Sequence, residues 1–331
     1  MGRYPFKAAA NKYLDAREGF VSPKTFQVVG QRFHRLGEIF ENLRKANKVK
    51  STDPRIMGIN DIRALVLFME GEGLQQSTQS AYLTTLNKLL LHQGNPVLER
   101  IRSEGGRLPK SIPKDLQSLE ESDIRSIQKA ARTLKGWQGS IARFLTFVYP
   151  STGLRMSELR LADVDHLDPK NWTLYVSHPK GERSYGKKRI VLILPQARGA
   201  VTEFLTERER YLEKAGFPDA KPLIPCYYRG EIRYYSQSGL YPIKQKVEAI
   251  AGISFKFKDY RDAFAQLTVD RDPSSLSAVS RQLGHRTTLT TELHYARIRS
   301  GNALKALEEV WSDHNPKSNF IEKKEFLSGY S

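Results

Sequence analysis

Helical periodicity in the N-terminal third of the chain constrains the fold most strongly. Apolar residues recur there at alternating spacings of four and three, the pattern of helices that bury one face. The clearest helix begins after Ser22 and Pro23, which have the residue types of an N-cap and of a first helical turn. Its apolar stripe consists of Val29, Phe33, Leu36, Phe40 and Leu43. Residues 60–71 and a segment that opens at Ser77 continue the pattern, so a small all-helical unit is expected.

A linker separates this unit from the rest of the chain. The helical pattern stops near Gly94, and residues 105–114 have the glycine, proline and charge content of a linker. We therefore expect an N-terminal helical domain over residues 1–104, a linker over residues 105–118 and a second domain with a C-terminal tail over residues 119–331.

The second domain is expected to be mostly helical with one short β-rich region. A helix should start at Glu120, and another should end at Pro150, because proline interrupts helical hydrogen bonding. Residues 172–177 and 188–194 are β-rich, and the polar segment between them predicts a hairpin with a long turn. Beyond Pro195 the pattern is helical again. The fold class is therefore mainly α with a small β-hairpin or sheet.

The charge of the chain points to an anionic partner. The 331 residues include 53 Lys and Arg against 36 Asp and Glu, a formal net charge of +17. Such a surplus repels itself unless an anion neutralises it, and nucleic acid is the usual partner. A basic RNA-binding protein and a protein that binds an anionic membrane are the alternatives.

Other sequence features indicate the compartment. No apolar run approaches the roughly 20 residues needed to cross a bilayer, and the start of the chain lacks the apolar core of a signal peptide. Cys226 is the only cysteine, which rules out an intramolecular disulfide and a four-cysteine zinc site. We expect a cytoplasmic, nucleoid-associated protein with no membrane partner.

Three segments combine residue types that bind phosphate. In residues 151–159, a glycine-containing turn leads into a helix with Arg155 at its start, where a planar guanidinium suits a phosphate. Glu158 follows one helical turn later and could hold that guanidinium. The alternative is an ordinary surface Arg–Glu pair. In the second segment, Lys258 and Arg261 share one helical face, either as an anion site or as a solvated basic face.

The third segment places a histidine and a tyrosine close together. Gly284 ends a helix that begins near Asp272, His285 follows at once, and Tyr295 lies on the next helix. The alternative for Tyr295 is a half-buried aromatic residue, because the chain contains 15 tyrosines and most must be structural.

Together and in this order, the segments resemble the signature boxes of the tyrosine recombinase, or phage integrase, family. That family shows a T-G-x-R-x-x-E-L box, a lysine in a β-hairpin, an H-x-x-R box, and an L-G-H box followed by a tyrosine. The residues that take these places here are Arg155, Lys180, Arg261, His285 and Tyr295. Lys187 and Lys188, on the far arm of the hairpin, match the family lysine less well than Lys180.

Two positions depart from the family pattern. Lys258 stands where most members have histidine, which resembles a variant among archaeal viral and plasmid integrases. The nucleophilic tyrosine most often occupies the position that is His294 here, whereas the run Thr290 to Tyr295 resembles members that end in T-T-x-x-H-Y. Lys258 is then either a third phosphate-binding cation or the acceptor of the tyrosine proton. A lysine accepts a proton only when deprotonated, and its usual pKa is about 10.4.

The resemblance implies a helical core-binding domain, a mixed, mostly helical catalytic domain, and a site-specific recombinase for integration- or excision-type strand exchange. Tyr295 would form a 3′-phosphotyrosyl bond, with Arg155 and Arg261 gripping the phosphate. Lys180 would protonate the leaving 5′-oxygen, and His285 would form a hydrogen bond to a non-bridging oxygen of the phosphate. No metal, ATP or other cofactor is implied. The partners would be double-stranded attachment sites and, on paired sites, a homotetramer formed from free monomers.

Three other functions are compatible with parts of the pattern. A type IB topoisomerase shares the chemistry but relaxes supercoils as a monomer. A catalytically silent DNA-binding protein could keep the fold, and a general RNA-binding protein would leave the boxes unexplained. After Ser300, a helix with an apolar face is expected to dock either on its own domain or on a neighbouring subunit. That face consists of Leu304, Leu307, Val310 and Trp311.

Overall fold

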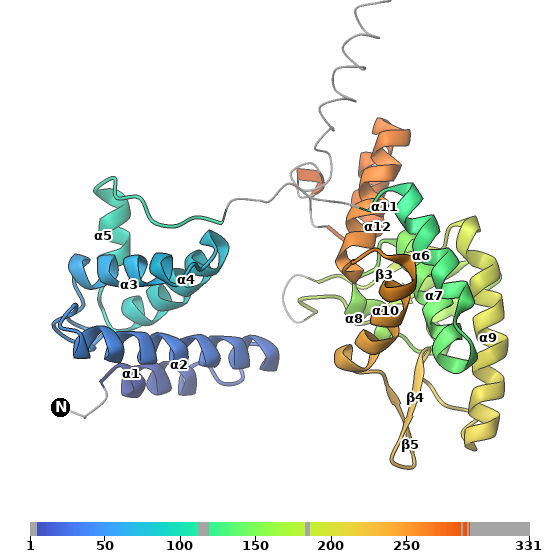
Figure 1. The fold of residues 1–331 in the computed structure, drawn as a ribbon, viewed down its shortest axis with the longest axis horizontal. Helices are drawn as coiled ribbons and strands as arrows, with labels where there is room; N and C mark the ends of the chain where they lie inside the picture. The colour runs from blue at the N-terminus through green and yellow to red at the C-terminus, as the bar shows by residue number, and fades with distance from the viewer. Residues whose placement is uncertain (1–4, 112–118, 183–185, 286, 290, 292–331) are drawn as a thin grey trace, which may run out of the picture. The chain divides into compact units, whose positions relative to one another are not determined.

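The computed structural model describes residues 5–111, 119–182, 186–285, 287–289 and 291 (Figure 1). The predicted nucleophile Tyr295 and the helix expected after Ser300 lie outside these residues. The chain divides into two compact units, Met1–Asp115 and Leu116–Ser331. Within the described residues, no helix is both long and apolar enough to cross a bilayer.

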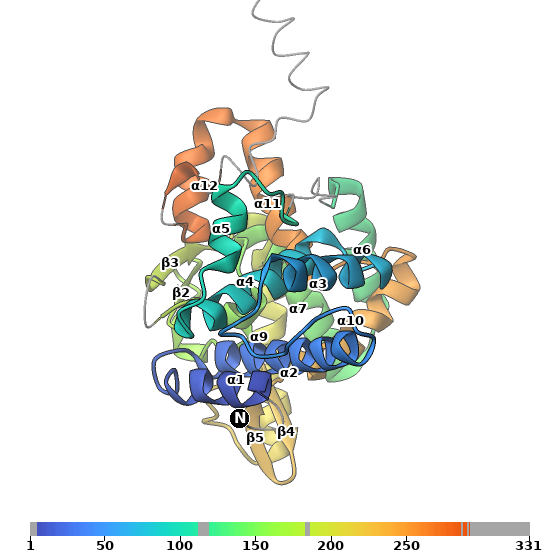
Figure 2. The same cartoon turned by 90° about the vertical axis from the view of Figure 1, so that its left-hand side faces the viewer.

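The first unit is helical, as the periodicity predicts. Ser22 caps its longest helix by accepting a hydrogen bond from the backbone N–H of Thr25 at 3.2 Å. The expected stripe of that helix is buried at Phe33, Leu36, Phe40 and Leu43, and it packs against α1, which runs alongside (Figure 2). The helices are α1 (Pro5–Asp15), α2 (Pro23–Lys45), α3 (Ile59–Gly71), α4 (Gln76–His92) and α5 (Val97–Ser103).

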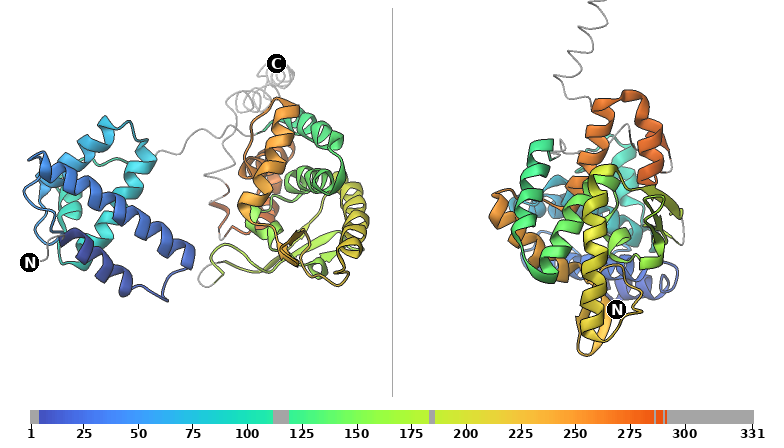
Figure 3. Two further views of the ribbon diagram at one scale, coloured as in Figure 1. Left: turned by 60° about the horizontal axis from the view of Figure 1, so that its bottom comes forward. Right: turned by 90° about the vertical axis from the view of Figure 1, so that its right-hand side faces the viewer.

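The second unit is built around α7, which packs against α6, α9, α10 and α11 (Figure 3). Its helices are α6 (Glu121–Thr133), α7 (Gly136–Thr152), α8 (Met156–Arg160), α9 (Pro195–Ala215), α10 (Gln237–Ala251), α11 (Phe257–Arg271) and α12 (Leu276–Leu283). Short 3-10 turns cover Val164–His166 and Pro273–Ser275. Most of α7 is buried, so the helix forms the centre of a core that the surrounding helices complete.

The predicted hairpin is present and extends into a three-stranded sheet. Strands β1 (Leu167–Asp168), β2 (Thr173–Val176) and β3 (Arg189–Leu192) pair antiparallel in that order. In the β2–β3 register, Leu174 lies opposite Val191 and both are buried, while Tyr175 and Ile190 lie opposite each other on the exposed face. The mainly helical fold with small antiparallel sheets is therefore confirmed.

Two details differ from the sequence-based expectation. Helix α7 does not end at Pro150 but continues to Thr152. Proline cannot donate to the carbonyl of Thr146, and the side-chain amide of Gln128 donates to that carbonyl instead, at 3.2 Å. A second hairpin, β4 (Pro225–Tyr228) and β5 (Glu231–Tyr234), was not predicted. Positive φ angles of 51° at Arg229 and 85° at Gly230 give the tight turn that two-residue hairpin loops favour.

Candidate active site

The turn between α7 and α8 positions the first predicted site residue. Gly153 ends α7 with a left-handed φ of 64°, and Arg155 is the N-cap of α8. A Cβ atom on Gly153 would lie 2.6 Å from Leu283 Cδ2 and 2.7 Å from Phe264 Cδ1. Only glycine therefore allows this turn to pack directly against α11 and α12.

Glu158 holds Arg155, as the sequence predicts. Its side chain is fully buried and accepts from the backbone N–H of Arg155 at 2.9 Å and from Nη1 of Arg155 at 2.8 Å. The Arg155 side chain is 28% exposed, so its guanidinium keeps access to solvent. The Arg–Glu pair is thus anchored in the core on the carboxylate side and open on the guanidinium side.

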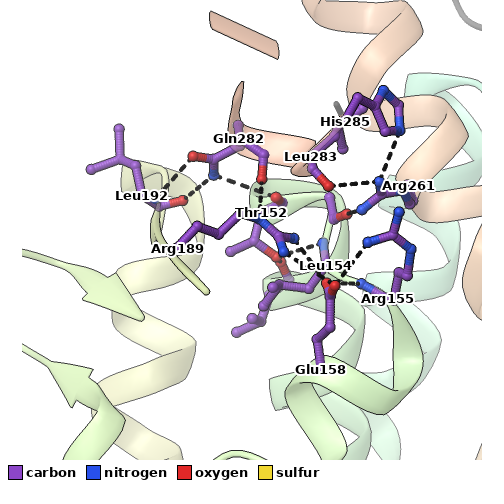
Figure 4. Close-up of polar contacts among 12 residues, drawn as sticks. Thr152, Leu154, Arg155, Glu158, Arg189, Leu192, Arg261, Gln282, Leu283 and His285 are labelled. Atoms are coloured by element: carbon purple, nitrogen blue, oxygen red, sulfur yellow. Dashed lines mark hydrogen bonds and ion pairs between the residues drawn. The ribbon is translucent and has the colours of Figure 1, made fainter. Parts of the chain in front are cut away.

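A second arginine, which the sequence analysis missed, binds the same carboxylate. Nη1 and Nη2 of Arg189, at the start of β3, donate to Oε1 and Oε2 of Glu158 at 3.2 and 2.9 Å. Burial alone would raise the pKa of Glu158, but the hydrogen bonds and charge of Arg189, helped by Arg155, hold this pKa below its ordinary value. Glu158 is therefore an ionised carboxylate between two guanidinium groups (Figure 4).

Arg261, on α11, joins the first and third segments. Its side chain is buried, and Nη1 donates to the carbonyl of Gly153 at 2.7 Å while Nη2 donates to the carbonyl of Leu283 at 2.8 Å. Nη2 also lies 3.0 Å from Nε2 of His285. The three segments that the sequence analysis singled out therefore meet at one place (Figure 4).

His285 is held on both sides of its ring. Gly284 ends α12 with a left-handed φ of 68°, and the His285 N–H donates to the carbonyl of Ser280 at 3.0 Å. Nδ1 lies 2.8 Å from the hydroxyl of Thr291. A guanidinium can only donate, so the contact with Arg261 makes Nε2 an acceptor and places the imidazole proton on Nδ1.

The two predicted lysines lie at the surface of the second unit. Lys258 is 66% exposed and forms an ion pair with Oδ2 of the buried Asp262 at 3.4 Å. Lys180 is exposed in the turn between β2 and β3, which a backbone hydrogen bond from Gly186 to Gly181 closes at 2.7 Å. Lys188, one of the weaker candidates, is exposed and lies 3.9 Å from Glu182. No contact described for these lysines reaches the Arg155, Arg261 and His285 cluster.

The site offers no assembled set of metal ligands in the part of the chain described. There, no three His, Cys, Asp or Glu side chains come together as a group that could hold a metal ion. What the site does offer is two cationic guanidinium groups and an imidazole around one point, an arrangement suited to an anionic oxygen.

Solved structures share this fold over most of the chain. The XerH site-specific recombinase bound to palindromic difH substrate matches with a TM-score of 0.66 and 18% identity over 93% of this chain and 85% of that chain. The Tn1549 transposon integrase in complex with transposon right end DNA matches with a TM-score of 0.61 and 18% identity over 91% and 98%. The chain has the tyrosine recombinase fold.

A third recombinase gives the same result. A lambda integrase dimer bound to a COC′ core site matches with a TM-score of 0.61 and 15% identity over 87% of this chain and 76% of that chain. No protein-family model and no curated protein matches the sequence. The resemblance inferred from the sequence motifs is thus confirmed at the level of the tyrosine recombinase fold, and the roles of individual residues depend on the geometry of the site.

Proposed function

We propose that the chain is a site-specific DNA recombinase that cuts and rejoins DNA through a 3′-phosphotyrosyl intermediate at Tyr295. The observation that carries this proposal is the convergence of Arg155, Arg261 and His285, from separate segments of a chain with the tyrosine recombinase fold. The net charge of +17 supports a polyanionic substrate such as DNA.

The proposed cleavage step forms one phosphorus–oxygen bond and breaks another. The Tyr295 oxygen attacks phosphorus while the phenol proton passes to water, and the bond from phosphorus to the 5′-oxygen breaks as Lys180 gives its proton to the leaving oxygen. Arg155 and Arg261 stabilise the charge that develops on the non-bridging oxygens. Attack by another 5′-hydroxyl then reverses the step and rejoins the strand. Because the phosphotyrosine conserves the bond energy, this cycle needs no ATP.

His285 takes its proposed part through Nε2, the ring atom that lies 3.0 Å from Nη2 of Arg261. A phosphate oxygen can only accept, so in this proposal Nε2 carries a proton and donates it in a hydrogen bond to a non-bridging oxygen.

Lys258 acts in this proposal as a third phosphate-binding cation. It lies one helical turn before Arg261 on α11, and its side chain is 66% exposed, so the amine is accessible to a bound phosphate. The alternative role for Lys258 is to accept the tyrosine proton.

The proposed partners are double-stranded attachment sites and further copies of the chain. We propose a monomer that assembles into a tetramer on two paired sites. A lambda integrase tetramer bound to a Holliday junction, 17% identical with a TM-score of 0.59, supports this assembly.

Covalent trapping tests the proposal. The chain is incubated with nicked duplexes of randomised sequence, from which a short downstream fragment with a free 5′-hydroxyl diffuses away after cleavage, so that a covalent adduct accumulates. The adduct is detected on denaturing gels, and the DNA it carries is sequenced to give a selected duplex. A sequence-specific adduct is expected. Relaxation of supercoiled plasmid without any selected site would instead identify a topoisomerase, and no adduct on any duplex would identify a silent DNA-binding protein.

A further inference from the structure

Glu158 presents an electrostatic problem for the proposed phosphate site. Its ionised carboxylate is fully buried and lies 2.8 Å from Nη1 of Arg155. A one-to-one pair of these two residues would be neutral overall. A neutral pair stabilises the charge of a phosphate far less than a lone guanidinium does, because the carboxylate repels the anion that the guanidinium attracts.

Arg189 removes this problem by binding the other side of the carboxylate. It makes two hydrogen bonds to Glu158, whereas the side chain of Arg155 makes one. With Arg189 present, the three side chains carry one net positive charge. The Arg189 side chain is only 11% exposed and the Arg155 side chain 28%, so the more accessible of the two guanidinium groups belongs to Arg155.

Arg189 also contacts the segment that carries His285. Its Nε atom donates to the carbonyl of Gln282 at 2.9 Å, near the end of α12. A Cβ atom on Gly284 would lie 2.9 Å from the Arg189 guanidinium, so the glycine allows the chain to pass directly over that group. The β3 residue thus touches both the Arg155 segment and the His285 segment.

The side chain of Gln282 strengthens this connection to β3. Its amide nitrogen donates to the carbonyl of Leu192 at 2.8 Å, and its amide oxygen accepts from the Leu192 N–H at 3.1 Å. The same nitrogen lies 3.3 Å from the carbonyl of Thr152, the last residue of α7 before the turn that leads to Arg155. The end of α12 is therefore fixed to the strand on which Arg189 lies.

We propose that Arg189 is a positioning residue that offsets the charge of Glu158, so that the positive charge of Arg155 acts on the scissile phosphate. This inference rests on the recombinase function proposed above. Arg189 itself does not touch the DNA. It acts through Glu158 on Arg155, and through the Gln282 carbonyl on the loop that carries His285.

A charge-balance experiment separates this role from a purely structural one. Arg189→Gln removes the net positive charge of the trio, and the double variant Glu158→Gln/Arg189→Gln restores it without restoring Arg189. Formation of the covalent adduct is measured in a single turnover on the selected duplex, together with duplex affinity and melting temperature. The matched control is Arg233→Gln on β5. Arg233 also pairs with a glutamate, Glu231, at 2.7 Å, but it belongs to none of the three site segments.

The expected result is a rate defect that the second substitution corrects. Arg189→Gln should slow adduct formation by about 100-fold, the usual cost of losing one oxyanion-stabilising group, with duplex affinity changed less than about threefold. The double variant should form the adduct at least about tenfold faster than Arg189→Gln. Arg233→Gln should behave as wild type. A double variant that is folded and as slow as Arg189→Gln would overturn the proposal.

A neutral substrate gives an independent readout. Replacing one non-bridging oxygen of the scissile phosphate by a methyl group removes its negative charge, so the defect of Arg189→Gln should shrink on this methylphosphonate duplex. A defect of unchanged size would show a structural role only. Arg189→Lys keeps the charge but loses the two-pronged contact with Glu158, so it should be slower than wild type but faster than Arg189→Gln. This variant replaces Arg189→Gln in the comparison if Arg189→Gln does not fold. If the wild-type chain forms no adduct, the recombinase proposal is wrong. If the double variant does not recover the rate of adduct formation, only the role proposed for Arg189 is wrong.

Discussion

The guanidinium of Arg261 donates to the carbonyl oxygen of Gly153 at 2.7 Å, although 108 positions separate the two residues in the sequence. The same group donates to the carbonyl of Leu283, just before the loop that carries His285. Arg261 is thus a phosphate-binding candidate and, at the same time, one of the residues that hold two site segments together. Loss of Arg261 should therefore affect both the charge and the geometry of the site.

Tyr295→Phe should abolish the covalent adduct while leaving duplex affinity within about twofold. The hydroxyl is the proposed nucleophile, whereas the ring can contribute only packing, which phenylalanine retains. Denaturing gels measure the adduct and a binding titration measures the affinity. Tyr241→Phe, at an exposed tyrosine of α10, is the matched control and should form the adduct normally. An adduct in Tyr295→Phe together with none in His294→Ala would assign the nucleophile to His294, the position that the tyrosine occupies in most family members.

Lys258→Arg should retain adduct formation within about tenfold of wild type. Arginine keeps the positive charge and can still pair with Asp262, which lies 3.4 Å from the lysine amine. Arginine cannot deprotonate near neutral pH, so it cannot accept the tyrosine proton. Rates of adduct formation between pH 6 and 9 provide the measurement. An inactive but folded Arg variant, with an active His variant, would assign the proton-accepting role to Lys258.

The sequence predicted those parts of the fold and site that depend on local patterns. The capped start of α2, its buried stripe and the β2–β3 pairing follow from periodicity and turn chemistry, which act within a few residues. The Arg155–Glu158 contact follows from their three-residue spacing, which places Arg155 at the N-cap and Glu158 in the first turn of the same helix. The β4–β5 hairpin also has a local signal, since the dipeptide Arg229-Gly230 stands between β-prone tyrosines, but the prediction of helix beyond Pro195 did not include it.

The remaining features depend on contacts between distant segments. Nothing near Arg189 in the sequence indicates that it binds Glu158, because the pairing is set by the way β3 packs beside α8 and α12. The continuation of α7 through Pro150 depends on Gln128, an α6 residue that satisfies the carbonyl left without a helical donor. Single-sequence patterns contain no information on such partners.

Gly153→Ala should destabilise the second unit by about 1–3 kcal/mol, since a left-handed φ and two contacts under 3.0 Å both oppose a Cβ atom there. Thermal unfolding followed by circular dichroism measures the effect. The matched control is Gly199→Ala on α9, where a Cβ would meet nothing within 4 Å. That control should stabilise the helix by about 0.5–1 kcal/mol. Equal melting temperatures for the two variants would show that the turn at Gly153 accommodates a Cβ atom without loss of stability.

Removal of the residues from Gly301 onward should leave single-site DNA binding intact but weaken assembly on paired sites. The expected apolar face of that segment, which includes Leu304 and Trp311, needs a covering surface, and a neighbouring subunit can supply it. Light scattering on one-site and two-site DNA measures the assembly. An unchanged tetramer in the truncated chain would exclude exchange between subunits, and gross unfolding would instead show docking on the chain's own domain.

Glu158→Gln should change the acid sensitivity of the second unit. The pKa of Glu158 is lowered in the folded chain from its ordinary value of 4.5, so its ionised form contributes stability that is fully present above that value. This contribution is lost as the pH falls through the folded-state pKa, because protonation breaks the pairing with Arg189 and Arg155.

The melting temperature of Glu158→Gln should therefore lie below that of wild type at pH 7, and the gap should narrow as the pH falls from 5 to 3. Other carboxylates titrate equally in both proteins, so the pH dependence of this difference in melting temperature reports the titration of Glu158 alone. A gap that stays constant over this range would show that Glu158 is not held ionised by its two arginines. Repeating the series in Arg189→Gln tests the cause: without the principal partner of Glu158, the gap should be smaller at pH 7 and should narrow at a higher pH.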